Sequence, residues 1–186
     1  MKSLESEMHL DTFISGQLVN LVALDERVAI NSRWYSWFND AVATAWMQQH
    51  HFPTTQQSQI QFVSDKLAGN AHKLQLGIED RLSGTLIGVI SLSDIDWVSR
   101  RAEVAVFLGE PEFRTLDRWH EASSLIVDHA FNSLNLHRIH GGSINKSVAD
   151  LFVRLLGFRD EGILREHAFK DGAYRDCYIF GRTRAD

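Results

Sequence analysis

The hydrophobic and polar positions near the start of the chain predict a strand followed by a helix. Residues 17–24, QLVNLVAL, alternate and are rich in β-branched side chains, as strands are. Asp25 follows, and aspartate is a residue type that caps helices. A stripe of aromatic side chains spaced three and four positions apart then predicts a helix to about residue 39, carrying Trp34, Trp37 and Phe38.

Two more helical segments are expected before the pattern changes. Residues 41–47, AVATAWM, have the composition of a short helix, and residues 50–55, HHFPTT, have that of a turn. A further helix is expected to start at Thr54 or Thr55 and to end near Leu67.

Strands dominate the pattern from about residue 70 onward. Residues 81–84 have the composition of a hairpin turn, and Gly88 indicates a bulge in the strand that follows. We expect strands at residues 73–79, 85–95, 100–109 and 136–144, helices at 117–134 and 146–156, and a closing strand pair around residues 170–172. Gly157 is placed to end the last helix. The order is that of a mixed α/β protein, and a Rossmann unit is excluded because no strand leads into GxGxxG.

Length, composition and charge are those of one ordinary globular domain. The chain has 186 residues and a formal net charge of −5, so nothing indicates a nucleic-acid partner or an anionic membrane. No apolar run is long enough to cross a bilayer, and the N-terminus lacks the apolar core of a signal peptide. We therefore expect a cytoplasmic protein with residues 1–16 as a leader and residues 17–186 as a single domain.

Cysteine and histidine give no indication of a metal site. Cys177 is the only cysteine, so an internal disulfide cannot form and the cysteine-based zinc spacings are absent. Nine histidines occur, but apart from the adjacent His50 and His51 they are scattered, and no HExxH or HxxxH pair is present. We expect no bound metal.

Several stretches of the chain match a known pattern. The most specific is residues 155–181, LLGFRDEGILREHAFKDGAYRDCYIFG, and it is accompanied by RRAEVAVFLGEPEFR at 100–114, LNLHRI at 134–139 and WFNDAVATAWM at 37–47. With the order of elements, these stretches resemble the GNAT acyltransferase superfamily, and most closely its branch of ribosomal-protein and spermidine acetyltransferases. The resemblance covers roughly residues 17–182.

The resemblance implies an α/β (α+β) fold of the GNAT type, with a central mixed, mostly antiparallel sheet flanked by helices. It implies an N-acetyltransferase that moves an acetyl group from acetyl-coenzyme A, as co-substrate, to a primary amine. The acceptor would be a small amine, an amino sugar or a protein N-terminus. The expected partner is therefore a small-molecule or peptide amine, with no nucleic acid and no membrane, and the likeness is consistent with a homodimer.

The resemblance also places the coenzyme. In this family the fourth strand pairs with the pantetheine arm, and the turn and helix N-terminus after it hold the pyrophosphate. The strand edge would be Val106, Phe107 and Leu108. The backbone facing the phosphates would belong to Leu116, Asp117, Arg118, Trp119 and His120. The family pattern is Arg or Gln, two residues, Gly, one residue, then Gly or Ala; Arg114 fits the first position, whereas Asp117 and Trp119 replace the glycines.

Two interpretations of these replacements are open. Glycine accepts unusual backbone angles and lets a phosphate approach N–H groups closely. The Asp117 carboxylate would repel a pyrophosphate unless Arg114 and Arg118 offset its charge, and Trp119 would crowd the phosphates or turn outward. Alternatively, Asp117 caps the following helix and the coenzyme binds in a slightly different geometry.

A second departure concerns the acid for the leaving thiolate. Much of the family has a tyrosine on the helix after the fifth strand. Counting forward from Asn145 puts that position at Phe152, and counting back from Gly157 puts it at Val153, so no tyrosine is present in either case. We expect a lower rate rather than no reaction. Asn145 itself is either a contact to the pantetheine arm or the N-cap of the helix over 146–156.

Glu103 is the first candidate for the general base. A carboxylate on a central strand can order a water that deprotonates the amine, or it can bind the ammonium directly. The alternative role is a salt bridge to Arg100 or Arg101. Asp94 and Asp96 are weaker candidates, because turn formation explains them well.

The resemblance places the acceptor pocket between the early helices and the last hairpin. The candidates there are Trp37, Phe38, Asn39, Trp46, His50, His51 and Phe52. Aromatic side chains in such segments are more often core than site, but His50 or His51 could act as a base near neutral pH. The pI near 6.0 and the absence of an acidic run argue against a polyamine acceptor.

Two functions of different classes follow from these observations. The first is an active N-acetyltransferase, favoured by the fourth strand, Asn145 and the closing segment. The second is a non-catalytic GNAT-fold binding or interaction protein with an eroded coenzyme A site, favoured by Asp117, Trp119 and the missing tyrosine. Thermal stability with and without acetyl-coenzyme A distinguishes the two.

Overall fold

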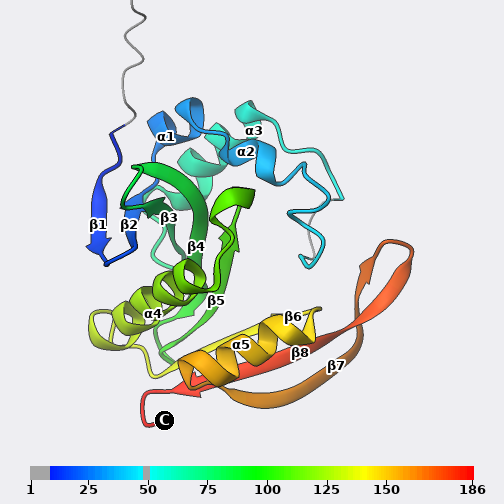
Figure 1. The fold of residues 1–186 in the computed structure, drawn as a ribbon. Helices are drawn as coiled ribbons and strands as arrows, with labels where there is room; N and C mark the ends of the chain where they lie inside the picture. The colour runs from blue at the N-terminus through cyan, green and yellow to red at the C-terminus, as the bar shows by residue number, and fades with distance from the viewer. Residues whose placement is uncertain (1–8, 48–50) are drawn as a thin grey trace, which may run out of the picture.

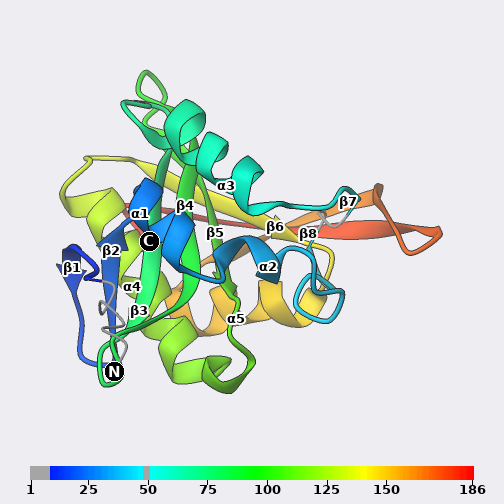
Figure 2. The same cartoon turned by 90° about the horizontal axis from the view of Figure 1, so that it is seen from above.

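The computed structural model describes residues 9–47 and 51–186, which form one mixed sheet between two layers of helices (Figure 1; Figure 2). The strands are β1 (Thr12–Ser15), β2 (Val19–Ala23), β3 (Leu74–Asp80), β4 (Thr85–Asp96), β5 (Arg101–Leu108), β6 (Arg138–Ser143), β7 (Arg159–Lys170) and β8 (Ala173–Thr183). The helices are α1 (Glu26–Asn31), α2 (Trp34–Trp37), α3 (Gln56–Phe62), the π-helix η1 (Val63–Leu67), the 3-10 helix η2 (Pro111–Phe113), α4 (Leu116–Asn132) and α5 (Lys146–Leu156).

The strands lie in the order β1-β2-β3-β4-β5-β6-β8-β7. Every neighbouring pair is antiparallel except β5 and β6, which are parallel. The α+β architecture, with a mixed and mostly antiparallel sheet flanked by helices, is therefore confirmed.

The first quarter of the chain differs from its prediction in three places. Thr12–Ser15 lie in the segment that we predicted to be a leader, and they form the edge strand β1 instead. Asp25 caps α1 as expected, accepting from Val28 N at 2.9 Å, but the helix stops at Asn31 and a separate turn, α2, follows. Residues 41–47 form consecutive turns rather than the predicted helix.

The remaining elements follow the predicted order. Thr55 caps α3 with a reciprocal capping box to Ser58. The register of β3 against β4 shifts beside Gly88, where we predicted a bulge. Gly157 ends α5 with a positive φ of 69°, a conformation that glycine adopts without strain.

Two apolar layers hold the sheet. On one face, α4 and α5 bury side chains such as Ile126 and Phe152 against the sheet. On the other face, α1–α3 bury Trp34 and Trp37 over β2 and β4 (Figure 1). Within the described residues, no helix is long and apolar enough to cross a membrane.

Candidate functional site

The parallel strands β5 and β6 are paired for only three residues and then separate. Arg101, Ala102 and Glu103 pair with Arg138, Ile139 and His140, but β5 continues to Leu108 and β6 to Ser143 without further pairing. The opening starts at the Glu103–His140 pair and faces the N-termini of α4 and α5, which follow β5 and β6 in the chain. An exposed strand edge of this kind can hydrogen-bond an extended ligand as an added strand would.

The phase of hydrogen bonding decides which β5 residues face the opening. Gly109 N donates to Ile87 O at 2.8 Å, and in an antiparallel pair every second residue bonds to the neighbouring strand. By that alternation, Val106 and Leu108 direct their N–H and C=O groups to the opening. Phe107, which we predicted to be part of this edge, directs its backbone to β4. Its ring stacks on that of Phe38, with ring centroids 5.3 Å apart, on the face of the sheet that α1–α3 cover.

The helix α4 begins at Leu116 with its first backbone donors free. Its N-cap is Thr115, whose side chain makes no capping hydrogen bond, and the first bond of the helix runs from Trp119 N to Thr115 O at 3.1 Å. The N–H groups of Leu116, Asp117 and Arg118 therefore have no acceptor in the part of the chain that the structure describes. An uncapped N-terminus on a 17-residue helix has the geometry and partial charge of an anion site.

The two residues in glycine positions lie in the regular helix. Asp117 is the second helical residue, so the interpretation of Asp117 as the N-cap is wrong, and neither Asp117 nor Trp119 has a positive φ. Trp119 neither crowds the helix end nor turns outward: it is half-buried against the core, with its ring edge-on to Phe152 at 5.0 Å. The backbone therefore needs no glycine here, and of the two replacements it is the Asp117 carboxylate that opposes an anion, through its charge.

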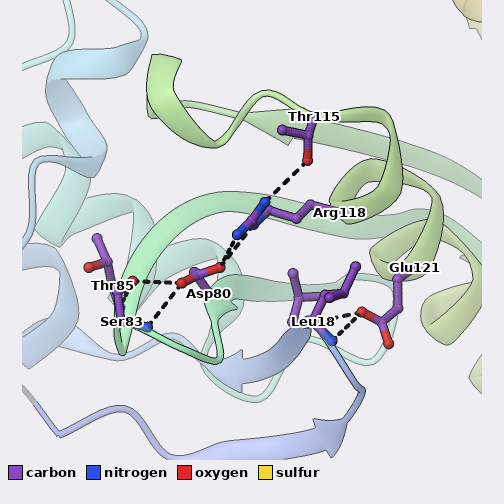
Figure 3. Close-up of polar contacts among 8 residues, drawn as sticks. Leu18, Asp80, Ser83, Thr85, Thr115, Arg118 and Glu121 are labelled. Carbon is purple, nitrogen blue, oxygen red and sulfur yellow. Dashed lines mark hydrogen bonds and ion pairs between the residues drawn. The ribbon is translucent and has the colours of Figure 1, made fainter.

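The two arginines that we expected to offset this charge are engaged elsewhere. Arg114 donates from Nη2 to Gly109 O at 2.7 Å and from Nε to Leu108 O at 3.1 Å, so it holds the turn against the end of β5. Arg118 pairs with Asp80 at 2.8 Å and donates from Nη1 to Oγ1 of the N-cap residue Thr115 at 3.4 Å, so its guanidinium lies beside the helix end but is engaged by protein groups (Figure 3). His120, the next predicted contact, lies within 3.3 Å of Leu155 O on α5.

The N-terminus of α5 is closed by its own residues. Asn145 is the N-cap, and its side chain accepts from Ser147 N at 2.9 Å, so the structure supports the capping role. Phe152, which we predicted to contact the coenzyme, is 3% exposed and stacks on Phe180 at 4.2 Å, so it belongs to the core. Val153 is partly buried beside the same core.

These features fit a coenzyme with an extended arm and a diphosphate. Among the described residues, Val106 and the N–H of Leu108 offer a free strand edge, while the Leu108 carbonyl accepts from Arg114, and the first turn of α4 offers three free N–H groups at the same end of the sheet. The two donor sets are those that a pantetheine arm and a diphosphate require.

Glu103 and His140 occupy the vertex of the opening. They are direct partners across β5 and β6 and both are half-buried, so their side chains share one face of the sheet. Burial lowers the pKa of His140; the charges of Glu103 and Glu161 oppose this shift, and those of Arg138 and Arg101 add to it.

The charged residues near Glu103 have other contacts than a salt bridge to it. Arg101 pairs with Asp96 at 3.6 Å, and among the described residues no ion pair involves Glu103. Asp96 accepts from the N–H groups of Val98 and Ser99, as a turn residue does. Asp94 lies within β4, at the register shift between Ser93 and Asp96, with a positive φ of 50°, so it belongs to a bulge rather than to the turn that we expected.

The predicted acceptor residues fall into two groups. Trp37 is buried, donates from Nε1 to Glu110 at 2.8 Å, and packs so closely on Gly109 that a Cβ there would lie 2.0 Å from its ring. Asn39 holds a loop closed by bonding Thr54 N at 2.7 Å and Thr54 O at 2.6 Å. The exposed side chains are Trp46, His51 and Phe52. His50 lies outside the described residues.

The last hairpin contacts the same loop. Lys170, at the end of β7, is buried and donates from Nζ to Thr44 O at 3.1 Å. The segment before α3 and the β7–β8 hairpin therefore meet, as the resemblance implied for the acceptor side (Figure 2).

Four residues with defined contacts in the structure were not predicted from the sequence, namely Asp80, Glu121, His140 and Lys170. The available signal for His140 was its position five residues before the helix cap Asn145 on the strand after α4. Asp80 and Glu121 act over 38 and more than 100 residues of chain, and no local pattern reveals such pairs.

Comparison with known proteins agrees with this geometry. Residues 22–146 match the family described as the acetyltransferase (GNAT) domain. The chain is 27% identical over 159 residues to the uncharacterized N-acetyltransferase p20 of Bacillus licheniformis, covering 81% of this chain and 85% of that protein. It is 32% identical over 96 residues to spermidine N(1)-acetyltransferase of Escherichia coli K12, covering 50% of each.

A solved structure shares the fold. Spermidine N-acetyltransferase from Vibrio cholerae, determined in complex with CoA and spermine, superposes with a TM-score of 0.80 at 22% identity. The match covers 91% of this chain and 98% of that one.

Proposed function

The chain belongs to the GNAT family of acetyltransferases, and we propose that it transfers the acetyl group of acetyl-coenzyme A to a small primary amine. The observation that carries the proposal is the opening between β5 and β6, which lies beside the uncapped N-terminus of α4. A strand edge and an anion site at one end of a sheet suit a long thiol carrier with a diphosphate.

The reaction sets what the protein must supply. Acetyl-coenzyme A, when bound, provides an activated acyl group as a thioester. A bond forms between the amine nitrogen and the carbonyl carbon, and the C–S bond breaks. An ammonium acceptor loses two protons overall: one neutralises the thiolate, and the other passes to solvent. The protein therefore needs a proton acceptor at the vertex of the opening and N–H donors beside it.

Glu103 and His140 are the groups that we assign to the proton at this vertex. Glu103 can order a water or bind the ammonium through its carboxylate. Burial lowers the pKa of His140 against the opposing charge of Glu103, which favours the neutral imidazole, and a neutral imidazole can accept a proton. Arg101, Arg138 and Glu161 are the other charged groups that face it.

The acceptor side is framed by the loop that Asn39 closes and by the β7–β8 hairpin that Lys170 ties to it. Relatives from Escherichia coli and Vibrio cholerae carry the name spermidine acetyltransferase, which supports small amines as the first class to test. The charges near the opening are mixed in sign rather than acidic, so amino sugars and N-terminal peptides belong in the same test.

The test measures thiol release from acetyl-coenzyme A in the presence of spermidine, an amino sugar and an N-terminal peptide, each with the protein at a fixed concentration. We expect saturable release with at least one amine. Thermal unfolding with excess acetyl-coenzyme A accompanies it, and a ligand at 100 times its Kd raises the free energy of unfolding by about 2.7 kcal/mol. Absence of any thermal shift at millimolar acetyl-coenzyme A would contradict the proposal and favour the non-catalytic alternative.

Variants at the vertex test the assignment of the proton acceptor. Glu103→Gln is expected to lower kcat about 100-fold or more if Glu103 accepts the proton directly or through water. His140→Gln is expected to move the acidic limb of the pH–rate profile. Glu26→Gln, on the exposed first turn of α1, is the matched carboxylate control and should leave kcat unchanged. Equal rates in wild type, Glu103→Gln and His140→Gln would remove both residues from the mechanism.

A further inference from the structure

The first two turns of α4 are tied to the sheet by two acidic groups outside the opening. One tie runs from Arg118 to Asp80 at the end of β3: Arg118 Nε lies 2.9 Å and Nη2 lies 2.8 Å from the same carboxylate oxygen. Asp80 is 2% exposed and also accepts from Ser83 N at 3.0 Å and from Ser83 Oγ at 2.8 Å. Figure 3 shows Arg118 reaching from α4 to Asp80 beside the β3–β4 turn.

The second tie runs from Glu121, one turn further along α4, to the backbone before β2. Its carboxylate accepts from Leu18 N at 2.7 Å, as Figure 3 shows. It also accepts from Val19 N at 3.1 Å and from Gln17 N. Three N–H groups on one carboxylate form a charge-assisted cluster, which is stronger than neutral hydrogen bonds. The two ties hold the same end of α4, at positions three residues apart.

The tie between Asp80 and Arg118 persists at neutral pH, and it leaves the helix end open. Burial alone would raise the pKa of Asp80, but hydrogen bonds from Ser83 and Arg118 and the charge of Arg118 lower it below its usual value, so the carboxylate stays ionised. Arg118 also donates toward Thr115 Oγ at 3.4 Å, which occupies the hydroxyl of the N-cap residue. In the part of the chain that the structure describes, no side chain caps the N–H groups of residues 116–118.

We propose that Asp80 with Arg118, together with Glu121, are positioning groups that fix the first turn of α4 for a diphosphate in place of the two family glycines. The inference rests on the proposed function, because it concerns how this chain holds the coenzyme. A glycine turn adapts its backbone to a phosphate, whereas here a regular helical turn is held rigid from the sheet side. Arg118 then acts through the helix position and not as a direct phosphate ligand.

The test is a double-mutant cycle on coenzyme A binding, measured by calorimetry with the full chain. Asp80→Asn, Arg118→Gln and the double variant should each weaken binding by a similar factor of about tenfold, since all three break the same tie. The KM for acetyl-coenzyme A should rise while kcat at saturation is kept, because the groups hold a binding turn and do not touch the reacting atoms. Lys146→Gln and Asp150→Asn, which break the exposed ion pair on α5, are the matched controls and should leave affinity unchanged.

The outcomes distinguish a positioning role from a direct phosphate contact and from a purely structural role. If Arg118→Gln weakens binding while Asp80→Asn preserves or tightens it, Arg118 contacts the diphosphate itself and the inference is overturned. If the variants unfold at lower temperature but bind coenzyme A normally, the ties are structural only, which also overturns it. Where Asp80→Asn does not fold, Glu121→Gln takes its place with the same expected loss. If the unaltered protein does not bind coenzyme A, the proposed function itself is contradicted, and this result is known before any variant is made.

Discussion

The helices α4 and α5 both start at the open end of the sheet, yet their first turns are built in opposite ways. In α5 the cap residue Asn145 accepts hydrogen bonds from the second and third helical residues. Its side chain accepts from Ser147 N at 2.9 Å, and its carbonyl accepts from Val148 N at 3.1 Å. In α4 the cap residue Thr115 accepts from none of the first three helical residues through its side chain, and its carbonyl bonds only the fourth. The closed end needs no ligand, and the open end is ready for an anion.

The comparison teaches where the affinity for a phosphate resides. A motif with glycines is one way to expose backbone N–H groups, but any helix whose cap leaves them free offers the same donors. In this chain the side chains around α4 point elsewhere: Arg118 to Asp80, Trp119 to Phe152, and Arg114 to the end of β5. These side-chain directions therefore leave the backbone of the first turn of α4 accessible.

The largest expected effect comes from removing one free donor of α4. Leu116→Pro deletes the N–H of the first helical residue, and proline is well accepted there because Thr115 already has extended angles of φ −109° and ψ 151°. A hydrogen bond to a charged group contributes about 1.5–3 kcal/mol, so the Kd for coenzyme A should rise about 10- to 100-fold. Calorimetry measures the change.

The matched control is Lys146→Pro, which makes the same change at the first residue of α5. It should leave the Kd for coenzyme A unaltered, and both variants should keep the thermal stability of the parent. Equal losses of affinity in the two variants would show that the two helix ends do not differ in the way described.

A smaller effect is expected for Phe152→Tyr, which places a hydroxyl at one candidate position of the family tyrosine. Phe152 is enclosed by Trp119, Phe158 and Phe180, so the hydroxyl would be buried without a partner and would lower the free energy of unfolding by about 1–3 kcal/mol. Thermal unfolding measures this loss. Val153→Tyr, one residue on and less buried, is the comparison variant. A gain in kcat for Phe152→Tyr with unchanged stability would mean that the ring reaches the site after all.

Removal of the α5 cap tests the closed helix end. Asn145→Ala should lower the free energy of unfolding by about 1 kcal/mol, a fall of roughly 2–4 °C in Tm, because Ser147 N loses its acceptor. Asn145→Asp keeps an acceptor at the cap and should retain the stability of the parent. A loss of coenzyme A affinity in Asn145→Asp would instead reveal a contact of the side-chain amide with the pantetheine arm.

The smallest expected effect is a gain at Asp117. Asp117→Asn removes the charge at the second residue of α4 without changing its size, and the Kd for coenzyme A should fall a few-fold, up to about tenfold. Binding at two salt concentrations checks the cause, since an exposed charge effect shrinks as salt rises. Weaker binding in Asp117→Asn would show that the native turn uses its aspartate.

Most of the fold was predictable because its signals are local. The Thr55 capping box, the Asp25 cap and the Gly157 terminus each depend on a few adjacent residues, and the alternation that predicts β3 to β8 is a local pattern too. Residues 41–47 were wrongly predicted as a helix, since composition favoured it while the structure forms turns. Strand β1 was missed because its four residues gain their stability from pairing with β2.

For the candidate site, the order of elements is predictable from the sequence and the side-chain contacts are less so. The positions of Glu103 and of the turn before α4 follow from the order of elements. The inward turn of Trp119, the burial of Phe152 and the pairing of Arg118 with Asp80 depend on residues far away in sequence, and no local pattern contains them. Side-chain direction at a helix end is decided by the partners that tertiary packing brings near.

The central claim is that the backbone of the first turn of α4 binds the coenzyme through its free N–H groups. The most direct measurement is the change in amide nitrogen and proton chemical shifts on titration with coenzyme A. The account predicts large, saturable shifts for the amides of Leu116, Asp117 and Arg118, and little change for Ser147 and Val148, whose N–H groups are already bonded within α5. If the chemical shifts of the three α4 amides stay unchanged while the protein becomes saturated with coenzyme A, the claim is contradicted.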